Sequence, residues 1–430
     1  MLKEALIQAG MEAGLAAFID VFLGVIIAAS FGMLWVLFGI WVERKVVARI
    51  QIRVGQIRVG PYGLIQNVAD ALKLLTKEII IPRHADKPVY FLAPVLAVVS
   101  VILVAAVIPF SSVVIGTDLS IGIVYVMAVS SLGVVAILMA GWGSNNKYAL
   151  LGAFRSVAQL ISYEVPMVLA VLVPVMFAGT LSMQGLVGSQ HIWYLFAMPV
   201  TALLFLISAH AENGRAPFDL LEAESELIAG FNIEYSGMAW AMFYLAEFMH
   251  AFFAAIIFAV LFLGGWRGPG AEQIPFLGMV YLGIKAMLVY FVTMWLRMTV
   301  PRVRIDQLLD LNWKILVPVA LANLAFMALL FKVIPAPDYA AAQAIASDEF
   351  AGVTRGLYRF LGPELVAELP RTGLLLLANI AFFAAVAYVL RLVGRRARQQ
   401  VEELVDETDY TSAGRVSEPA RAGSPATATK

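Results

Sequence analysis

Acidic side chains are concentrated between residues 211 and 237, in a 430-residue chain that is 61% hydrophobic. We call this segment, AENGRAPFDLLEAESELIAGFNIEYSG, the acidic loop, and its one base is Arg215. Its six carboxylates are Glu212, Asp219, Glu222, Glu224, Glu226 and Glu234. Neighbouring carboxylates raise one another's pKa, and partial burial raises it further. Such a set would titrate as a coupled unit, so the pattern predicts a group that holds and releases protons near neutral pH.

Part of this pattern also has a purely structural explanation. Pro217–Phe218–Asp219 is typical of a helix start, with Asp219 as the N-cap and Glu222 three residues later. Carboxylates in a first turn also suit the helix dipole. This explanation accounts for two or three of the acids but not for all six.

Ionisable residues also lie inside long apolar stretches. Glu164 precedes Pro166 by two residues, Glu247 lies about 14 Å into its stretch at about 1.5 Å per residue, and Lys285 lies near the middle of another. His250 follows Glu247 by three residues, so the two would share a helix face. The plain alternative is that each makes a satisfied hydrogen bond between helices. Charges at bilayer depth are rare and usually mark ion or proton paths, which favours the functional interpretation.

The composition excludes several classes of protein. A mean hydropathy of +0.85 with 14% charged residues is typical of a polytopic membrane protein. The net charge is zero, which gives no case for nucleic-acid binding, and the absence of cysteine excludes disulfides and any iron–sulfur cluster ligated by this chain. Four scattered histidines predict no metal site.

The predicted fold class is an all-α polytopic membrane protein with about nine transmembrane helices, each needing about 20 apolar residues. The expected spans are residues 19–42, 89–109, 120–142, 157–178, 194–210, 238–263, 274–296, 313–334 and 372–393. Residues 1–334 would form a core of eight spans, with 335–371 as an outer connection and 372–393 as an additional C-terminal span. The polar stretch 394–430 is expected to be a disordered cytoplasmic tail.

The distribution of Lys and Arg predicts the orientation. Nine bases follow the first span, and more follow spans 3, 5, 7 and 9. The connections on the other side hold Arg267, Arg355, Arg359 and Arg371, with Lys3 near the N-terminus. The N-terminus should therefore lie outside, and the acidic loop and the C-terminus should lie on the cytoplasmic side. The first apolar stretch is expected to be retained as a transmembrane span.

The connection after the first span should carry an amphipathic helix on the cytoplasmic side, within residues 63–78. Leu64, Val68, Leu72 and Leu75 would lie on one face, and Gln66, Asp70, Lys73 and Lys77 on another. Such a helix lies along the membrane with its polar stripe toward protein or water. The simpler alternative is a surface helix with paired charges.

Four blocks of sequence resemble the H subunit (mitochondrial subunit 1) family of proton-pumping NADH:quinone oxidoreductase, respiratory complex I. They are VERKVVARIQIRVG…GPYGLIQNVADALKLLTKE (42–78), NKYALLGAFRSVAQLISYEVP (146–166), the acidic loop, and WLRMTVPRVRIDQLLDLNWKILVP (295–318). They occur in the family's order over roughly residues 15–335.

The resemblance implies a subunit that anchors the peripheral redox arm and frames a narrow quinone cavity, without being catalytic alone. The implied quinone-chamber residues are Glu43, Arg44, Arg53, Asp70, Arg215, Phe218, Glu222, Glu224 and Glu226. The implied proton-path residues are Glu164, Glu212, Asp219, Glu234, Glu247 and Lys285. Quinone, either ubiquinone or menaquinone, would be the substrate, with no metal or cluster on this chain. The partners would be the peripheral-arm, small membrane and antiporter-like subunits and membrane lipids, in the cell membrane.

The chain departs from the family pattern at three places. Gln56–Ile57 stand where Pro-Asn is usual, Leu221 replaces a small residue or proline, and Asn213–Gly214 stand where Thr-Asn is common. The extended C-terminus indicates a bacterial version. Alternatives are the equivalent subunit of an F420- or ferredoxin-linked complex or a membrane-bound hydrogenase, and a free-standing cation/proton antiporter.

Overall fold

The computed structural model describes residues 12–219, 230–335, 337 and 363–416, and the regular structure within these ranges is helical. Pairing of extended backbone there is limited to an isolated bridge between Pro109 and Ile115. The chain divides into two compact units, Met1–Leu376 and Leu377–Lys430, which are described separately. The acids Glu222, Glu224 and Glu226, and Leu221, lie outside the described residues.

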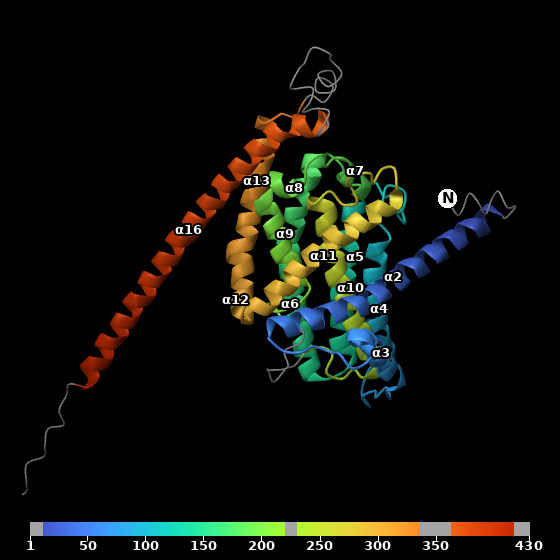
Figure 1. The fold of residues 1–430 in the computed structure, drawn as a ribbon. Helices are drawn as coiled ribbons and strands as arrows, with labels where there is room; N and C mark the ends of the chain where they lie inside the picture. Colours follow the sequence, from blue (N-terminus) through green and yellow to red (C-terminus); the bar gives the residue numbers. More distant parts are fainter. Residues whose placement is uncertain (1–11, 220–229, 336, 338–362, 417–430) are drawn as a thin grey trace, which may run out of the picture. The chain divides into compact units, whose positions relative to one another are not determined.

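The helices of the first unit are shown in Figure 1. They are α2 (Ala13–Ile50), η1 (Pro61–Gly63), α3 (Gln66–Thr76), α4 (Lys87–Ala105), α5 (Gly122–Gly143), α6 (Lys147–Ala178), α7 (Met183–Gly188), α8 (Tyr194–Ala197), α9 (Pro199–Glu212), α10 (Gly237–Phe262), α11 (Pro275–Thr299), α12 (Ile305–Asp310), η2 (Leu311–Leu316) and α13 (Val317–Val333). The last helix, α16 (Pro363–Val416), begins in this unit and continues into the second.

Helices lie over all nine predicted spans. Seven stretches among the described residues are long and apolar enough to cross a membrane, and α9 is a shorter apolar helix. α2 covers the first predicted span with 38 residues. The prediction of an all-α polytopic membrane protein is therefore confirmed.

Three predicted boundaries differ from the structure. The span expected at 194–210 is two helices, because Met198 leaves the helical region (φ −141°, ψ 60°) immediately before Pro199, and the residue before proline disfavours α conformation. α6 begins ten residues before 157, and neither Pro166 nor Pro174 ends it. α16 begins inside the expected outer connection and remains helical to Val416, where a disordered tail from residue 394 was expected.

α10 is the central helix of the first unit. In its most apolar window 78% of the residues are buried within the chain, against 11–50% for the other six spans. α2 and α11 cross the more upright helices obliquely (Figure 1). Trp35 of α2 stacks on Phe252 of α10 with ring centroids 3.6 Å apart, and Tyr290 of α11 meets Trp35 edge to face at 6.2 Å. The three helices are thus joined by aromatic contacts at mid-span.

α3 confirms the amphipathic helix expected after the first span. The Asn67 Nδ2 atom donates a 2.6 Å hydrogen bond to the Leu37 carbonyl, which fastens α3 to α2. Val68, Leu72 and Leu75 are all exposed, so the apolar face of α3 has no cover from the described part of the chain. An exposed apolar stripe of this kind suits a helix that lies on lipid or against another subunit.

Candidate functional site

Arg215 is the buried centre of an ion network between the acidic loop, α2 and α10. Its Nη1 atom lies 2.8 Å from Glu43 Oε2, and the two side chains are only 6% and 8% exposed. Its Nε atom lies 3.3 Å from Glu247 Oε1, and its guanidinium carbon lies 4.0 Å from the centre of the Phe248 ring. Burial lowers the pKa of Arg215, but the charge of Glu43 leads the interactions that raise it above its ordinary value. Arg215 is therefore a fixed cation.

Two residues of α11 complete the network, and sequence reasoning missed both as site residues. The Tyr290 hydroxyl donates a 3.1 Å hydrogen bond to Glu43 Oε2, and Arg297 Nη1 donates to Glu43 Oε1. Two carboxylates and two guanidiniums then balance in charge, which is what burial of ions requires. Tyr290 and Arg297 are seven residues apart, two helical turns, and this spacing is the signal that could have placed them on one face.

Hydrogen bonds from side chains to backbone carbonyls fix the described start of the acidic loop. Gln159 of α6 donates from Nε2 to the carbonyls of Ala211 (2.7 Å) and Phe218 (2.8 Å). His210 Nε2 donates to the Ala216 carbonyl at 2.9 Å. The Phe218 ring packs against Tyr163 at 5.6 Å between centroids. Arg215 is thus presented to Glu43 by a braced turn, and Gln159 was not singled out in the sequence because a single amide has no pattern.

A second charge cluster lies beside the first, between the end of α2 and α3. Arg44 Nη1 lies 2.8 Å from Asp70 Oδ2 and 3.1 Å from Gln56 Oε1, and Gln66 Nε2 donates to Asp70 Oδ1 at 3.2 Å. Burial raises the pKa of Asp70, but the hydrogen bonds from Arg44 and Gln66 and the charge of Arg44 lower it more, so the pKa lies below its ordinary value. Arg53, expected in the same group, instead donates to Gln51 at 2.7 Å.

The two clusters are adjacent because Glu43 and Arg44 are consecutive residues on α2. Glu43 is buried against Arg215, whereas Arg44 is exposed toward Asp70. Tyr244 of α10 lies within electrostatic reach of both residues and of Arg215. Most of the described residues predicted for a quinone chamber therefore lie together.

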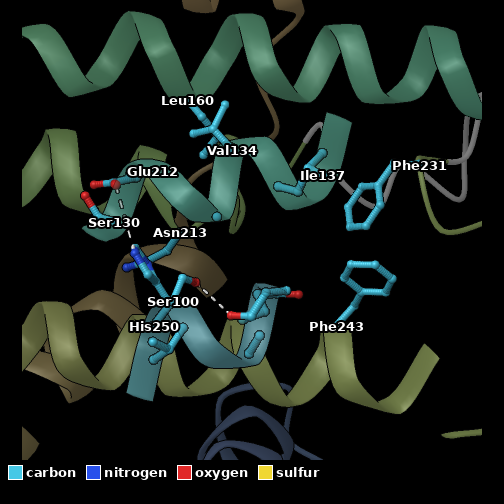
Figure 2. Close-up of a pocket in the computed structure, with 15 residues that line it drawn as sticks. Ser100, Ser130, Val134, Ile137, Leu160, Glu212, Asn213, Phe231, Phe243 and His250 are labelled. Carbon is cyan, nitrogen blue, oxygen red and sulfur yellow. Dashed lines mark hydrogen bonds and ion pairs between the residues drawn. The ribbon is translucent and has the colours of Figure 1, made fainter. Parts of the chain in front are cut away.

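A cavity of about 100 Å³ adjoins the network between α4, α5, α6 and α10. Figure 2 shows Glu212, Asn213 and His250 at one end and the rings of Phe231 and Phe243 at the other. Glu247 also lines it, so the acid paired with Arg215 borders this space. The lining of this cavity is mostly apolar, and its polar residues are Ser100, Ser130, Glu212, Asn213, Glu247 and His250. Its volume is sufficient for several water molecules, each needing about 10–15 Å³.

A smaller cavity of about 30 Å³ is also lined by Glu212 and His250, and its other lining residues are mostly apolar. His250 Nδ1 lies 2.8 Å from Asn213 Oδ1, and its Nε2 lies 3.9 Å from Glu212 Oε1. Glu164 of α6 lies close enough to act electrostatically on Glu212. Glu164, Glu212 and Glu247, three of the predicted proton-path residues, are thus brought to one region.

The remaining predicted path residues lie elsewhere or at the edge of the described chain. Glu234 accepts a 2.5 Å hydrogen bond from Asn146 at the start of α6. Lys285 donates to the carbonyls of Gly265 (2.9 Å) and Arg267 (2.7 Å). These carbonyls follow the end of α10 that lies about 22 Å from Glu247, at about 1.5 Å per residue. Asp219 is the last described residue before 220–229.

The family model described as NADH dehydrogenase matches residues 23–328, well over half of the chain and all of the site just described. The chain belongs to the NADH dehydrogenase family. Proteins named as the H subunit of NADH-quinone oxidoreductase are similar to it. That of Dehalococcoides mccartyi (strain CBDB1) is 48% identical over 313 residues, 73% of this chain and 87% of that protein. That of Bacillus cytotoxicus is 46% identical over 314 residues (72% and 94%), and that of Geobacillus kaustophilus is 48% identical over 298 residues (69% and 89%).

Membership in the NADH dehydrogenase family confirms the resemblance to the H subunit. Two departures from the family pattern lie in the site. Gln56 accepts a hydrogen bond from Arg44, and its carbonyl packs so closely on Gly63 that a Cβ there would clash with it. Asn213 is the partner of His250. Among the described residues no group of three His, Asp or Glu could hold a metal, and the absence of a metal stays a prediction.

Proposed function

We propose that this chain is the membrane subunit of a proton-translocating NADH:quinone oxidoreductase, where it forms the quinone chamber and couples quinone reduction to proton pumping through buried carboxylates. The observation that carries the proposal is the double pairing of Arg215. One guanidinium binds Glu43, a predicted chamber residue, and Glu247, a predicted path residue that borders the cavity. A change of charge at the chamber therefore reaches the cavity through a single side chain.

On the chamber side, the chain supplies shape and electrostatics rather than electrons. It has no cysteine, so the terminal iron–sulfur cluster and the electron transfer belong to neighbouring subunits. The chamber would be lined by the two charge clusters (Glu43, Arg44, Asp70 and Arg215), by Arg53 and Phe218, and by Glu222, Glu224 and Glu226 of the acidic loop. The exposed apolar face of α3 supports an access path along lipid for the quinone tail.

On the proton side, Glu164, Glu212 and Glu247 would begin the path, with water in the larger cavity between the last two. Asp219 and Glu234 would belong to the acidic loop's part of the same path. Lys285 is assigned by resemblance alone, because its ammonium group binds carbonyls of the connection after α10.

The coupling step follows from charge. Reduction of a quinone to quinol takes up two electrons and two protons, so the charge and hydrogen-bonding demand of the chamber change during each turnover. When Glu43, or negative charge in the chamber, attracts the Arg215 guanidinium more strongly, the interaction of Arg215 with Glu247 weakens. Glu247 then loses part of its counter-charge, and its affinity for a proton rises. The acidic loop would have two arrangements, and the redox state of the quinone would bias them.

The partners and placement follow from the same proposal. The other subunits would be those of the peripheral arm, the small membrane subunits and the antiporter-like subunits, all in the cell membrane. The end of the bundle that carries α3 and the acidic loop would face the cytoplasm, with the N-terminus outside. Residues 1–334 would form the subunit core and 372–393 an additional span.

The family match disfavours a free-standing antiporter, which would need no docking surface for a redox arm. An F420- or ferredoxin-linked complex differs in its electron-input subunits, not in this chain. The neighbouring genes distinguish an F420- or ferredoxin-linked complex from an NADH-linked complex, because only the NADH-linked complex includes the NADH-oxidising subunits.

The proposal is tested on the purified complex with Glu247→Gln and, as a control, Glu272→Gln at an exposed acid of the connection after α10. We expect Glu247→Gln to lower quinone reductase activity and proton pumping in proteoliposomes at least fivefold, with NADH:ferricyanide activity unchanged because it bypasses the membrane arm. Wild-type rates of both activities in an assembled Glu247→Gln complex would refute the proposed coupling role.

A further inference from the structure

The hydrogen bond between His250 and Asn213 fixes the tautomer of the imidazole. Asn213 Oδ1 lies 2.8 Å from His250 Nδ1, and an amide oxygen can only accept a hydrogen bond. The neutral ring therefore carries its hydrogen on Nδ1, and Nε2 is left as a bare acceptor. An amide oxygen does not take up a proton, so chemistry at this ring is confined to Nε2.

Nε2 faces Glu212. The distance from Nε2 to Glu212 Oε1 is 3.9 Å, longer than a hydrogen bond and short enough for one small side-chain movement to close it. The other charged groups near the pair are Glu164, which acts on Glu212, and Glu247, whose counter-charge is Arg215. The ring thus stands among carboxylates, the one cation nearby in the described part of the chain being already paired with Glu43 and Glu247.

Glu212 and His250 line both cavities, as do Val101 and Ser130. Ser100 and Ser130 lie in the walls of the larger cavity beside the pair (Figure 2). Each hydroxyl donates to a carbonyl of its own helix, Ser100 to Ala97 at 2.8 Å and Ser130 to Met127 at 2.9 Å. Their oxygens can therefore only accept hydrogen bonds in the cavity, which suits water molecules that carry an excess proton.

We propose that His250 is a proton carrier between Glu212 and water in the larger cavity, acting through Nε2, with Asn213 as the positioning residue that holds the ring in the Nδ1–H tautomer. The inference rests on the proposed function and adds a residue to its path. Protonated Glu212 gives its proton to Nε2, which leaves a carboxylate and an imidazolium ion. Nε2 then releases that proton to a cavity water on the side of Glu247, and the neutral ring is restored with Nδ1–H still bound to Asn213.

The test uses the intact complex in proteoliposomes, with His250→Asn and His250→Ala. Asparagine keeps a polar side chain of similar reach but cannot carry a proton at neutral pH. We expect both variants to translocate protons at least tenfold more slowly than wild type, in keeping with the loss of an acid–base group. Imidazole added at about 50 mM should restore at least half of the rate in His250→Ala, because the vacated space adjoins the cavity. His191→Ala, at a histidine that is paired with Glu364 at 2.8 Å and lines neither cavity, should show no response to imidazole.

Two outcomes would overturn the proposal. One is wild-type pumping in His250→Asn, which decides the matter even if His250→Ala fails to assemble. The other is a slow His250→Ala complex that imidazole does not restore. If His250→Asn pumps normally while Glu212→Gln and Glu247→Gln do not, the role of His250 fails and the proposed function stands. If all three variants pump normally, both fail.

Discussion

Arg215 Nη1 lies 2.8 Å from Glu43 Oε2, although the two residues are 172 positions apart in the chain. This buried ion pair joins the acidic loop to the end of the first span. Arg297 and Tyr290 bring α11 to the same carboxylate. Three separate parts of the chain therefore meet at Glu43, so the loss of this one carboxylate should affect all three.

Glu43→Gln should destabilise the subunit by roughly 3–5 kcal/mol, because it leaves the buried guanidinium of Arg215 and the half-buried guanidinium of Arg297 opposite the single charge of Glu247. The double variant Glu43→Gln/Arg297→Gln restores charge balance and should recover part of the loss. The apparent midpoint of thermal inactivation of the purified complex measures both effects. Asp310→Asn is the control: it breaks an exposed pair with Lys314 (side chains 60% and 71% exposed), worth at most about 1 kcal/mol. A Glu43→Gln complex as stable as Asp310→Asn would contradict the buried network.

Gly152→Ala should displace the end of the acidic loop. A Cβ at Gly152 would lie 2.6 Å from the backbone of Gly230, which cannot move as a flexible side chain does. We expect quinone reductase activity to fall severalfold while NADH:ferricyanide activity is kept. Gly188→Ala, where a Cβ meets nothing within 4 Å, should keep both. Equal quinone reductase activity in the two variants would show that the close contact between Gly152 of α6 and the backbone of Gly230 is not required for activity.

Asp70→Ala should weaken quinone-site inhibitors, because it removes the partner of Arg44 and loosens the junction of α2 and α3. We expect a rise of at least threefold in the concentration for half-inhibition. Arg53→Ala, assigned to the chamber by resemblance, should act in the same direction. Unchanged inhibitor response in either variant would remove that residue from the chamber.

The stabilisation from the ion pair between Asp70 and Arg44 should not depend on pH between about 8 and 5. The pKa of Asp70 is lowered from 3.8, so its stabilising contribution is present above that ordinary value and is lost only as pH falls through the lower pKa of the folded state. Hydrogen exchange of residues 66–76 should accordingly show constant protection over this range. Loss of protection between about pH 7 and 5 in wild type, absent in Asp70→Asn, would contradict the assignment.

Glu164→Gln and Glu226→Gln should each lower quinone reductase activity and proton pumping together in an assembled complex. Glu164 acts electrostatically on Glu212, so a neutral side chain there removes part of the coupling between acids. Glu226 lies outside the described residues, and its role rests on the family pattern. Pumping assays with a pH-sensitive dye provide the measurement, and normal rates would refute the role of the residue concerned.

Much of the fold could be predicted because the bilayer imposes length and hydrophobicity on each span. The spans at 89–109, 120–142 and 238–263 match α4, α5 and α10 to within a few residues. Ends set by local chemistry were less predictable. The break at Met198 depends on a proline that is often tolerated in membrane helices, and the end of α16 depends on polar residues that helices also accept.

The candidate site was predictable only in part. The acidic loop is visible in the sequence because its charges lie close together, and Glu43, Arg44 and Asp70 came from the family resemblance. Tyr290, Arg297 and Gln159 were missed because their roles depend on hydrogen-bond partners that lie 52 to 254 residues away in the sequence. The spacing of Tyr290 and Arg297 indicates a shared helix face, but it does not identify Glu43 as their partner.

Redox-induced infrared difference spectroscopy of the whole complex tests the central claim most directly, since it records protonation changes of carboxylic acids when the bound quinone is reduced. The account predicts a carboxyl C=O band that appears or disappears on reduction and is lost in Glu212→Gln or Glu247→Gln but kept in Glu272→Gln. A difference spectrum without such a band, or one unchanged in both cavity variants, would contradict the claim that quinone reduction alters the protonation of these buried acids.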